Sequence, residues 1–160
     1  EVMANGSLNY TVKGICIGMK VTWNYTPPTN GGDTFTSIKK GSKATLKIVQ
    51  DEKNGFVKEL YIQKEPDIDN RTFEAQLQKT VEQLQITYPF LSVKNKKNGT
   101  YLIDIPQEKR LGHEEHFSKV AKAFLHYVHN QDMPEWENEN TLAKYYITTT
   151  AVEMAKIGNK

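Results

Sequence analysis

A chain of 160 residues with 38% hydrophobic and 25% charged residues has the composition of an ordinary globular domain and can bury a sizeable core. The formal net charge of +2, from 21 basic and 19 acidic residues, gives no electrostatic argument for nucleic acid or an anionic membrane as a partner. The single cysteine, Cys16, excludes an internal disulfide, and no apolar run approaches the ~20 residues that span a bilayer.

The first residue is Glu1 and not methionine, so we expect a domain excised from a longer protein. We expect residues 1–160 to form a single domain. The composition does not decide between cytoplasm and periplasm.

The first half of the chain shows the alternation of apolar and polar residues that is typical of β-strands. Residues 15–25 give the clearest pattern, because every second residue is apolar. A shorter alternation over residues 8–12 precedes it, and Gly14 separates the two. The remaining strands are expected at 44–48, 60–62, 91–94 and 100–105, with turn-forming residues at 51–55 and 98–99 between them.

Three helices are predicted in the second half, because apolar residues recur there at spacings of three and four. Their expected ranges are 69–87, capped by Asp69 or Asn70; 112–130; and 138–157, beginning at Asn138 or Asn140 and C-capped by Gly158.

Strands that are segregated from helices favour an α+β fold over alternating βαβ units. We therefore predict an open antiparallel β-sheet with about three helices packed on one face. The predicted strand at 15–25 has small and polar residues on its second face, including Lys20, Thr22 and Asn24. We expect that face to form a dimer interface.

The sequence contains no catalytic or cofactor-binding motif. It has no Gly-x-Gly-x-x-Gly, no phosphate-binding loop that ends in Gly-Lys-Ser/Thr, no Cys-x-x-Cys and no Gly-x-Ser-x-Gly. We therefore assign no catalytic, cofactor-binding or metal-ligating residue. Cys16 is interpreted as a small packing residue and not as a catalytic thiol.

The four histidines form two pairs with helical i, i+3 spacing, His113 with His116 and His126 with His129. Such a pair can hold a metal ion, but the two pairs lie on different sides of one helix and cannot converge on one ion. His113, Glu114 and His116 open the second predicted helix, and we consider them candidates for facing a substrate. Acidic residues in a first turn also favour a helix by themselves.

Asp33 follows two glycines in a predicted loop and is a further substrate-facing candidate, since loops often carry function. The alternative is a solvated turn aspartate. Five aromatic residues suit either a sugar site or a core or interface: Trp23, Tyr25, Trp136, Tyr145 and Tyr146.

Several stretches, taken together in order and spacing, resemble a known family. They are 21–25 (Val-Thr-Trp-Asn-Tyr), 32–34 (Gly-Asp-Thr), 37–44, 101–106, 112–117, 140–146 and 148–155. From about Leu8 to Ala155 the chain resembles the C-terminal domain of oxidoreductases of the glucose–fructose oxidoreductase and inositol dehydrogenase (Gfo/Idh/MocA) family. The series of stretches carries this resemblance, since no single motif among them is highly specific.

The resemblance implies an N-terminal Rossmann domain that binds NAD or NADP in the parent protein. It also implies a C-terminal α+β domain whose open antiparallel sheet covers the substrate and often supplies an oligomer interface. The family's catalytic lysine and histidine map onto no residue of this chain. Where relatives tend to have histidine after Gly-Asp-Thr, this chain has Phe35, which argues against a catalytic role for that loop.

Three functions stay open at this point. The first is the substrate-covering and oligomerisation domain of an NAD(P)-dependent oxidoreductase that acts on a sugar or polyol, inactive without its own Rossmann domain. The second is a stand-alone carbohydrate- or protein-binding module. The third is a small metal-dependent enzyme that uses His113 and His116.

Overall fold

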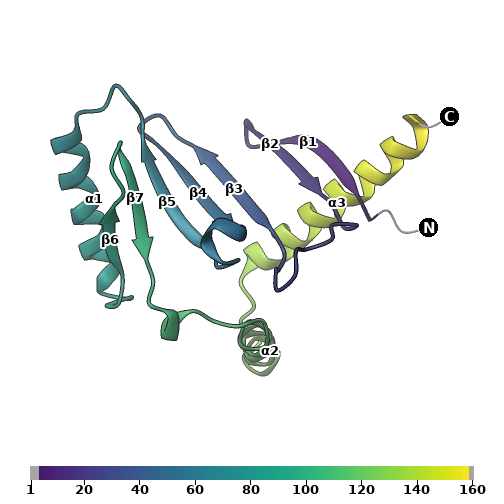
Figure 1. Ribbon diagram of the computed structural model, residues 1–160. Coiled ribbons are helices and arrows are strands. Elements are labelled where there is room, and N and C mark those ends of the chain that lie inside the picture. Colours follow the sequence, from purple (N-terminus) through teal and green to yellow (C-terminus); the bar gives the residue numbers. More distant parts are fainter. Residues whose placement is uncertain (1–3, 159–160) are drawn as a thin grey trace. The chain divides into compact units, whose positions relative to one another are not determined.

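The computed structural model describes residues 4–158, which form seven β-strands, three α-helices and two short 3-10 helices (Figure 1). The chain divides into two compact units. We call residues 27–112 the sheet unit. We call the described residues 4–26 and 113–158 the hairpin–helix unit.

The sheet unit is a five-stranded antiparallel sheet with the strand order β3-β4-β5-β7-β6. Helix α1 connects β5 to β6, and β7 then returns between these two strands (Figure 1). The elements are β3 (Phe35–Lys40), β4 (Ala44–Gln50), η1 (Glu52–Asn54), β5 (Glu59–Lys64), α1 (Asn70–Gln85), β6 (Ser92–Asn95), β7 (Thr100–Asp104) and η2 (Gln107–Lys109).

The core of this unit lies where α1 packs beside β6 and β7. Val81 of α1 and three consecutive residues of β7, Tyr101, Leu102 and Ile103, are its buried hydrophobic residues. The Phe73 ring lies 5.6 Å from that of Tyr101. The Tyr101 hydroxyl donates a 2.8 Å hydrogen bond to Glu74, also on α1. One helix and one central strand therefore hold the unit together.

Local turn chemistry sets both predicted connections in this unit. Between β4 and β5, Asp51 and Asn54 form a capping box around η1, and Gly55 follows with a φ of 63°. Between β6 and β7, Gly99 has a φ of 70°, a left-handed value that favours glycine. Both hairpins expected from the sequence are confirmed.

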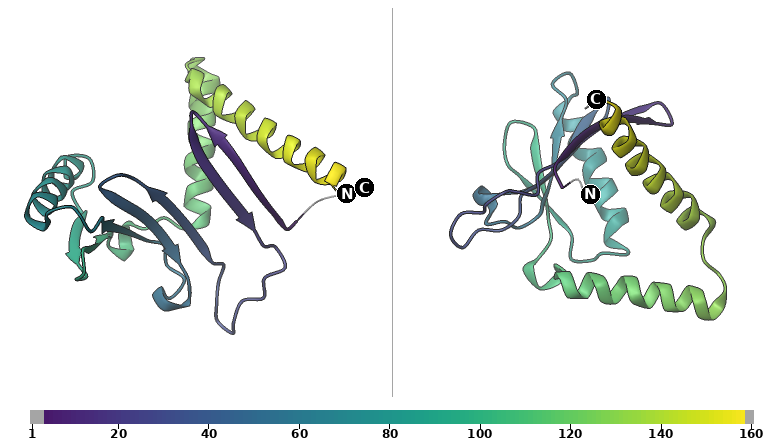
Figure 2. Two further views of the ribbon diagram at one scale, coloured as in Figure 1. Left: turned by 90° about the horizontal axis from the view of Figure 1, so that it is seen from above. Right: turned by 90° about the vertical axis from the view of Figure 1, so that its right-hand side faces the viewer.

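The hairpin–helix unit contains β1 (Gly6–Val12), β2 (Ile15–Val21), α2 (His113–Asn130) and α3 (Glu135–Gly158) (Figure 2). The two strands pair antiparallel around Lys13 and Gly14. Both turn residues have positive φ values, 48° and 80°, as a two-residue hairpin turn requires.

The predicted α+β class, the antiparallel pairing and the three helices are confirmed. The strands fall into two sheets, one of five strands and one of two. That residues 1–160 form a single domain stays a prediction.

Two element boundaries differ from the sequence-based ranges by three or more residues, and one strand was not predicted. The strand expected to reach Tyr25 ends at Val21, because its partner β1 begins at Gly6, opposite Val21. The Asn5 side chain accepts a 2.6 Å hydrogen bond from the Trp23 amide instead. Thr22 and Asn24 therefore lie outside β2, and the predicted polar strand face is wrong beyond Lys20.

The third helix begins at Glu135, earlier than expected. Pro134 precedes it with a fixed φ, and acidic residues in the first turn favour that end of the helix. The prediction also missed β3. Its residues show no clean alternation, and they form a strand because they pair along β4 at the sheet edge.

Candidate functional site

The four predicted substrate-facing residues belong to two different units. Asp33 is exposed in the loop before β3 of the sheet unit, where its backbone carbonyl accepts a 2.9 Å hydrogen bond from Gln50. His113, Glu114 and His116 form the exposed first turn of α2 in the hairpin–helix unit. Their role toward a substrate stays a prediction.

In the first turn of α2, the His113 ring contacts an apolar residue one turn later in the same helix. The His113 ring lies edge-on to Phe117, with 5.0 Å between the ring centroids. At the other end of α2, His126 lies 3.1 Å from a carboxylate oxygen of Asp132. Within residues 4–158 no three His, Cys, Asp or Glu side chains are grouped to hold a metal ion.

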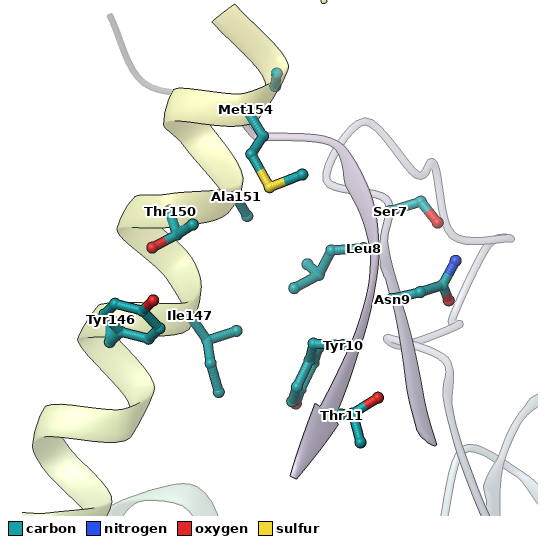
Figure 3. A pocket seen from close by; sticks show the side chains of 11 residues that line it. Ser7, Leu8, Asn9, Tyr10, Thr11, Tyr146, Ile147, Thr150, Ala151 and Met154 are labelled. Atoms are coloured by element: carbon teal, nitrogen blue, oxygen red, sulfur yellow. The ribbon is translucent and has the colours of Figure 1, made fainter. Parts of the chain in front are cut away.

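A groove with a volume of about 420 Å³ lies between β1 and α3. Leu8 and Tyr10 project from β1 toward the helix, and Ile147, Ala151 and Met154 project from the helix toward the strand (Figure 3). Leu8 and Tyr10 are alternate residues of a strand, so they share one face. The helical residues are spaced by four and three, so they share one side of α3.

The groove is apolar where the strand and the helix face each other. Its other lining residues carry mainly hydroxyl and amide groups or small side chains: Ser7, Asn9, Thr11, Tyr146, Thr150 and Ala155. Of the five aromatic residues considered for a sugar site, the lining includes Tyr146 alone. Periodicity in the sequence predicts a strand and a helix here, but it does not predict that residues 7–11 lie beside residues 146–155.

Both helices of this unit expose much of their apolar surface. On α2 the exposed residues lie on one side of the helix, and Phe124 has an exposed fraction of 63%. The others in this row are Phe117, Val120, Leu125 and Val128. On α3, Leu142 and Tyr145 have exposed fractions of 71% and 58%. Monomeric soluble proteins rarely leave extended apolar surface open, so these helices are candidate interaction surfaces.

The described residues do not fit a nicotinamide dinucleotide. Every strand pairing within residues 4–158 is antiparallel, whereas dinucleotides bind at the glycine-rich turn of a parallel βαβ unit. None of the helices within the same range is long and apolar enough to cross a membrane.

Comparison with known proteins identifies the class to which this fold belongs. Residues 1–156 match the family described as "Putative oxidoreductase C terminal domain", and the chain belongs to this family. The resemblance to an oxidoreductase C-terminal domain is confirmed. The family description places such domains at the C-terminal end of longer proteins.

A particular solved structure is similar to the chain, the crystal structure of a putative oxidoreductase from Parabacteroides merdae ATCC 43184. The two share 39% sequence identity and superpose with a TM-score of 0.91 over 95% of this chain. The matched part is 35% of that oxidoreductase chain, so this chain spans about a third of the relative's length. The search of curated proteins finds no match.

Proposed function

We propose that the chain is the substrate-covering and oligomerisation domain of an NAD(P)-dependent oxidoreductase that acts on a sugar or polyol. A Rossmann domain in the rest of the longer protein binds the nucleotide. One observation carries the proposal: 95% of this chain superposes, at 39% identity, on about a third of the solved structure described as a putative oxidoreductase.

The fold supports a role for this domain in substrate covering and not in nucleotide binding. The described strands include no parallel pair, so nucleotide binding falls to another domain. Helices α2 and α3 expose apolar surface that a neighbouring domain would cover. The exposed first turn of α2 offers His113, Glu114 and His116 as groups that hydrogen-bond to substrate hydroxyls.

For oligomerisation we propose the face of the sheet unit opposite α1. A cross-strand row on that face consists of Ile38, Lys47, Tyr61 and Leu102, one residue from each of four strands. Leu102 is buried within the unit, so the other three residues supply the contact. Tyr101, the neighbour of Leu102, points to the other face, where it contacts α1. Ile38, an exposed apolar residue on the edge strand, suits a contact between two copies.

The decisive experiment compares the 160-residue chain with the longer protein that carries it. We expect the longer protein to reduce NAD or NADP with members of a sugar and polyol panel, followed at 340 nm, and the isolated chain to show no turnover. Nucleotide-dependent turnover by the isolated chain, or a longer protein that binds neither nucleotide, would refute the proposal.

Two variant sets test the finer assignments. His113→Ala and His116→Ala should raise KM for the substrate, whereas His129→Ala, near the other end of α2, should not. Ile38→Glu should convert an oligomer to a monomer in sedimentation velocity, and Lys79→Glu on the exposed side of α1 should not. Unchanged KM values would remove the α2 residues from the substrate site, and an unchanged oligomer would remove the sheet face.

A further inference from the structure

Helix α3 has uncharged residues on two opposite sides, and one of these sides faces β1 within the described residues. The inner side carries Ile147, Ala151 and Met154, which face β1 across the groove (Figure 3). We call the second set the outer stripe of α3: Leu142, Tyr145, Thr149 and Val152. Successive helical residues lie about 100° apart, which places the outer stripe on the opposite side of the helix from Ile147.

The outer stripe has the composition of a packed surface. Its residues are spaced by three, four and three, as in a seam between packed elements, and none carries a charge. Leu142 and Tyr145 are exposed. A helix that is apolar on opposite sides is typical of a helix that is covered on both.

The threonine of the stripe needs no water. The Thr149 hydroxyl donates a 2.7 Å hydrogen bond to the backbone carbonyl of Tyr145 one turn earlier. The adjacent Thr148 makes the same kind of bond, 2.9 Å long, to the carbonyl of Lys144. Burying an unsatisfied hydroxyl is costly, but the Thr149 hydroxyl has its acceptor within the helix and leaves its methyl group for packing.

We propose that the outer stripe of α3 is the docking surface for an apolar face of the other domain of the longer oxidoreductase. The inference rests on the proposed function. The occupant follows from chain length, because about two thirds of the similar oxidoreductase lies outside the matched part. A domain in the same chain is present at high effective concentration, which favours it over a second copy.

Thiol labelling tests this inference directly. The native thiol is removed with Cys16→Ser, since Cys16 is exposed. Single cysteines are then placed on the stripe with Leu142→Cys or Tyr145→Cys. The matched control is Lys144→Cys, an exposed neighbour outside the stripe. Two stripe variants keep the test usable if one of them does not fold.

Each variant is labelled in the 160-residue chain and in the longer protein, at concentrations where sedimentation shows a monomer. We expect the stripe cysteines to react at least about tenfold more slowly in the longer protein, and the control cysteine to react equally in both. Equal rates for the stripe cysteines would overturn the inference. Protection that appears only at concentrations where two copies associate would overturn it in favour of a second copy.

Failure of the inference can be told apart from failure of the proposed function. Nucleotide-dependent turnover is measured on the same samples of the longer protein. Turnover together with unprotected stripe cysteines removes the docking surface and leaves the proposed function standing. A native protein whose intact mass leaves no room for another domain removes the proposed function itself.

Discussion

Lys64 at the end of β5 is a buried charged residue that stabilises the turn between β5 and α1. Its exposed fraction is 9%. Its ammonium group donates hydrogen bonds to the backbone carbonyls of Glu65, Pro66 and Ile68, at 3.0, 3.4 and 2.5 Å. The last of these residues directly precedes Asp69, the N-cap of α1. One side chain therefore satisfies three carbonyls in the turn between strand and helix.

Lys64→Met keeps the aliphatic stem and removes the donor, so these carbonyls lose their charged partner. A hydrogen bond from a charged group contributes about 1.5 to 3 kcal/mol, whereas the Glu65 carbonyl keeps a second hydrogen bond from the Ile68 amide and Pro66 is exposed. The bond to Ile68 is the shortest of the three and the one to Pro66 the longest. We therefore expect a total loss of about 2 to 4 kcal/mol in the free energy of opening the sheet unit.

Opening of the sheet unit is measured by hydrogen exchange of the β5 and β7 amides. Tryptophan fluorescence cannot measure it, because Trp23 and Trp136 lie in the hairpin–helix unit. Their fluorescence serves as an internal control and should not change. Lys79→Met, on an exposed position of α1, is the matched substitution. A Lys64→Met effect within about 0.5 kcal/mol of zero, the range of an ordinary surface change, would refute the reasoning.

Three further outcomes are expected. Burial, and next the hydrogen bond to Glu74, raises the pKa of Tyr101 from its ordinary 10.0 to about 12. Because the unfolded chain loses this proton first, stability falls as pH rises from about 10 to about 12, and Tyr101→Phe should reduce that fall in alkaline denaturation. Gly14→Ala, at a φ of 80°, should destabilise the β1–β2 hairpin by about 1 kcal/mol in hydrogen exchange, while Gly6→Ala, which meets no atom within 4 Å, should change less. Asp51→Ala removes the capping box and should weaken protection of the β4–β5 turn by about 1 kcal/mol.

The sequence predicts what depends on near neighbours. The turns at Gly14, Gly55 and Gly99 were predictable because positive φ values favour glycine whatever lies beyond the turn. Helix α1 was predictable because its cap, Asp69, and its apolar spacing lie within one short segment. Structural class follows from the order of such segments, so the α+β fold was predictable as well.

Long-range pairing set the features that the sequence did not predict. Strand β3 exists because residues 35–40 meet β4 at the sheet edge, and β2 ends at Val21 because β1 offers no partner beyond Gly6. The groove between β1 and α3 joins residues that are more than 130 positions apart in the chain. Periodicity gives a segment a face, but the surface against which that face packs is a property of the whole fold.

Helix α3 shows the difference between what local periodicity predicts and what long-range packing decides. From the sequence, six of its residues were available to pack: Leu142, Tyr145, Tyr146, Thr149, Val152 and Ala155. That set did not include Ile147 or Met154, which face β1 in the structure. The structure divides the apolar residues of α3 into an inner side against β1 and an outer stripe that holds Leu142 and Tyr145 exposed. An isolated surface helix gains nothing from a second apolar side, which costs solubility and adds no packing. A second side is stabilising only when another apolar surface covers it, and the internal hydrogen bond of Thr149 removes the cost of covering that hydroxyl. The apolar residues on both sides of this helix therefore have the same physical origin as the docking surface that we propose: each side packs against another surface.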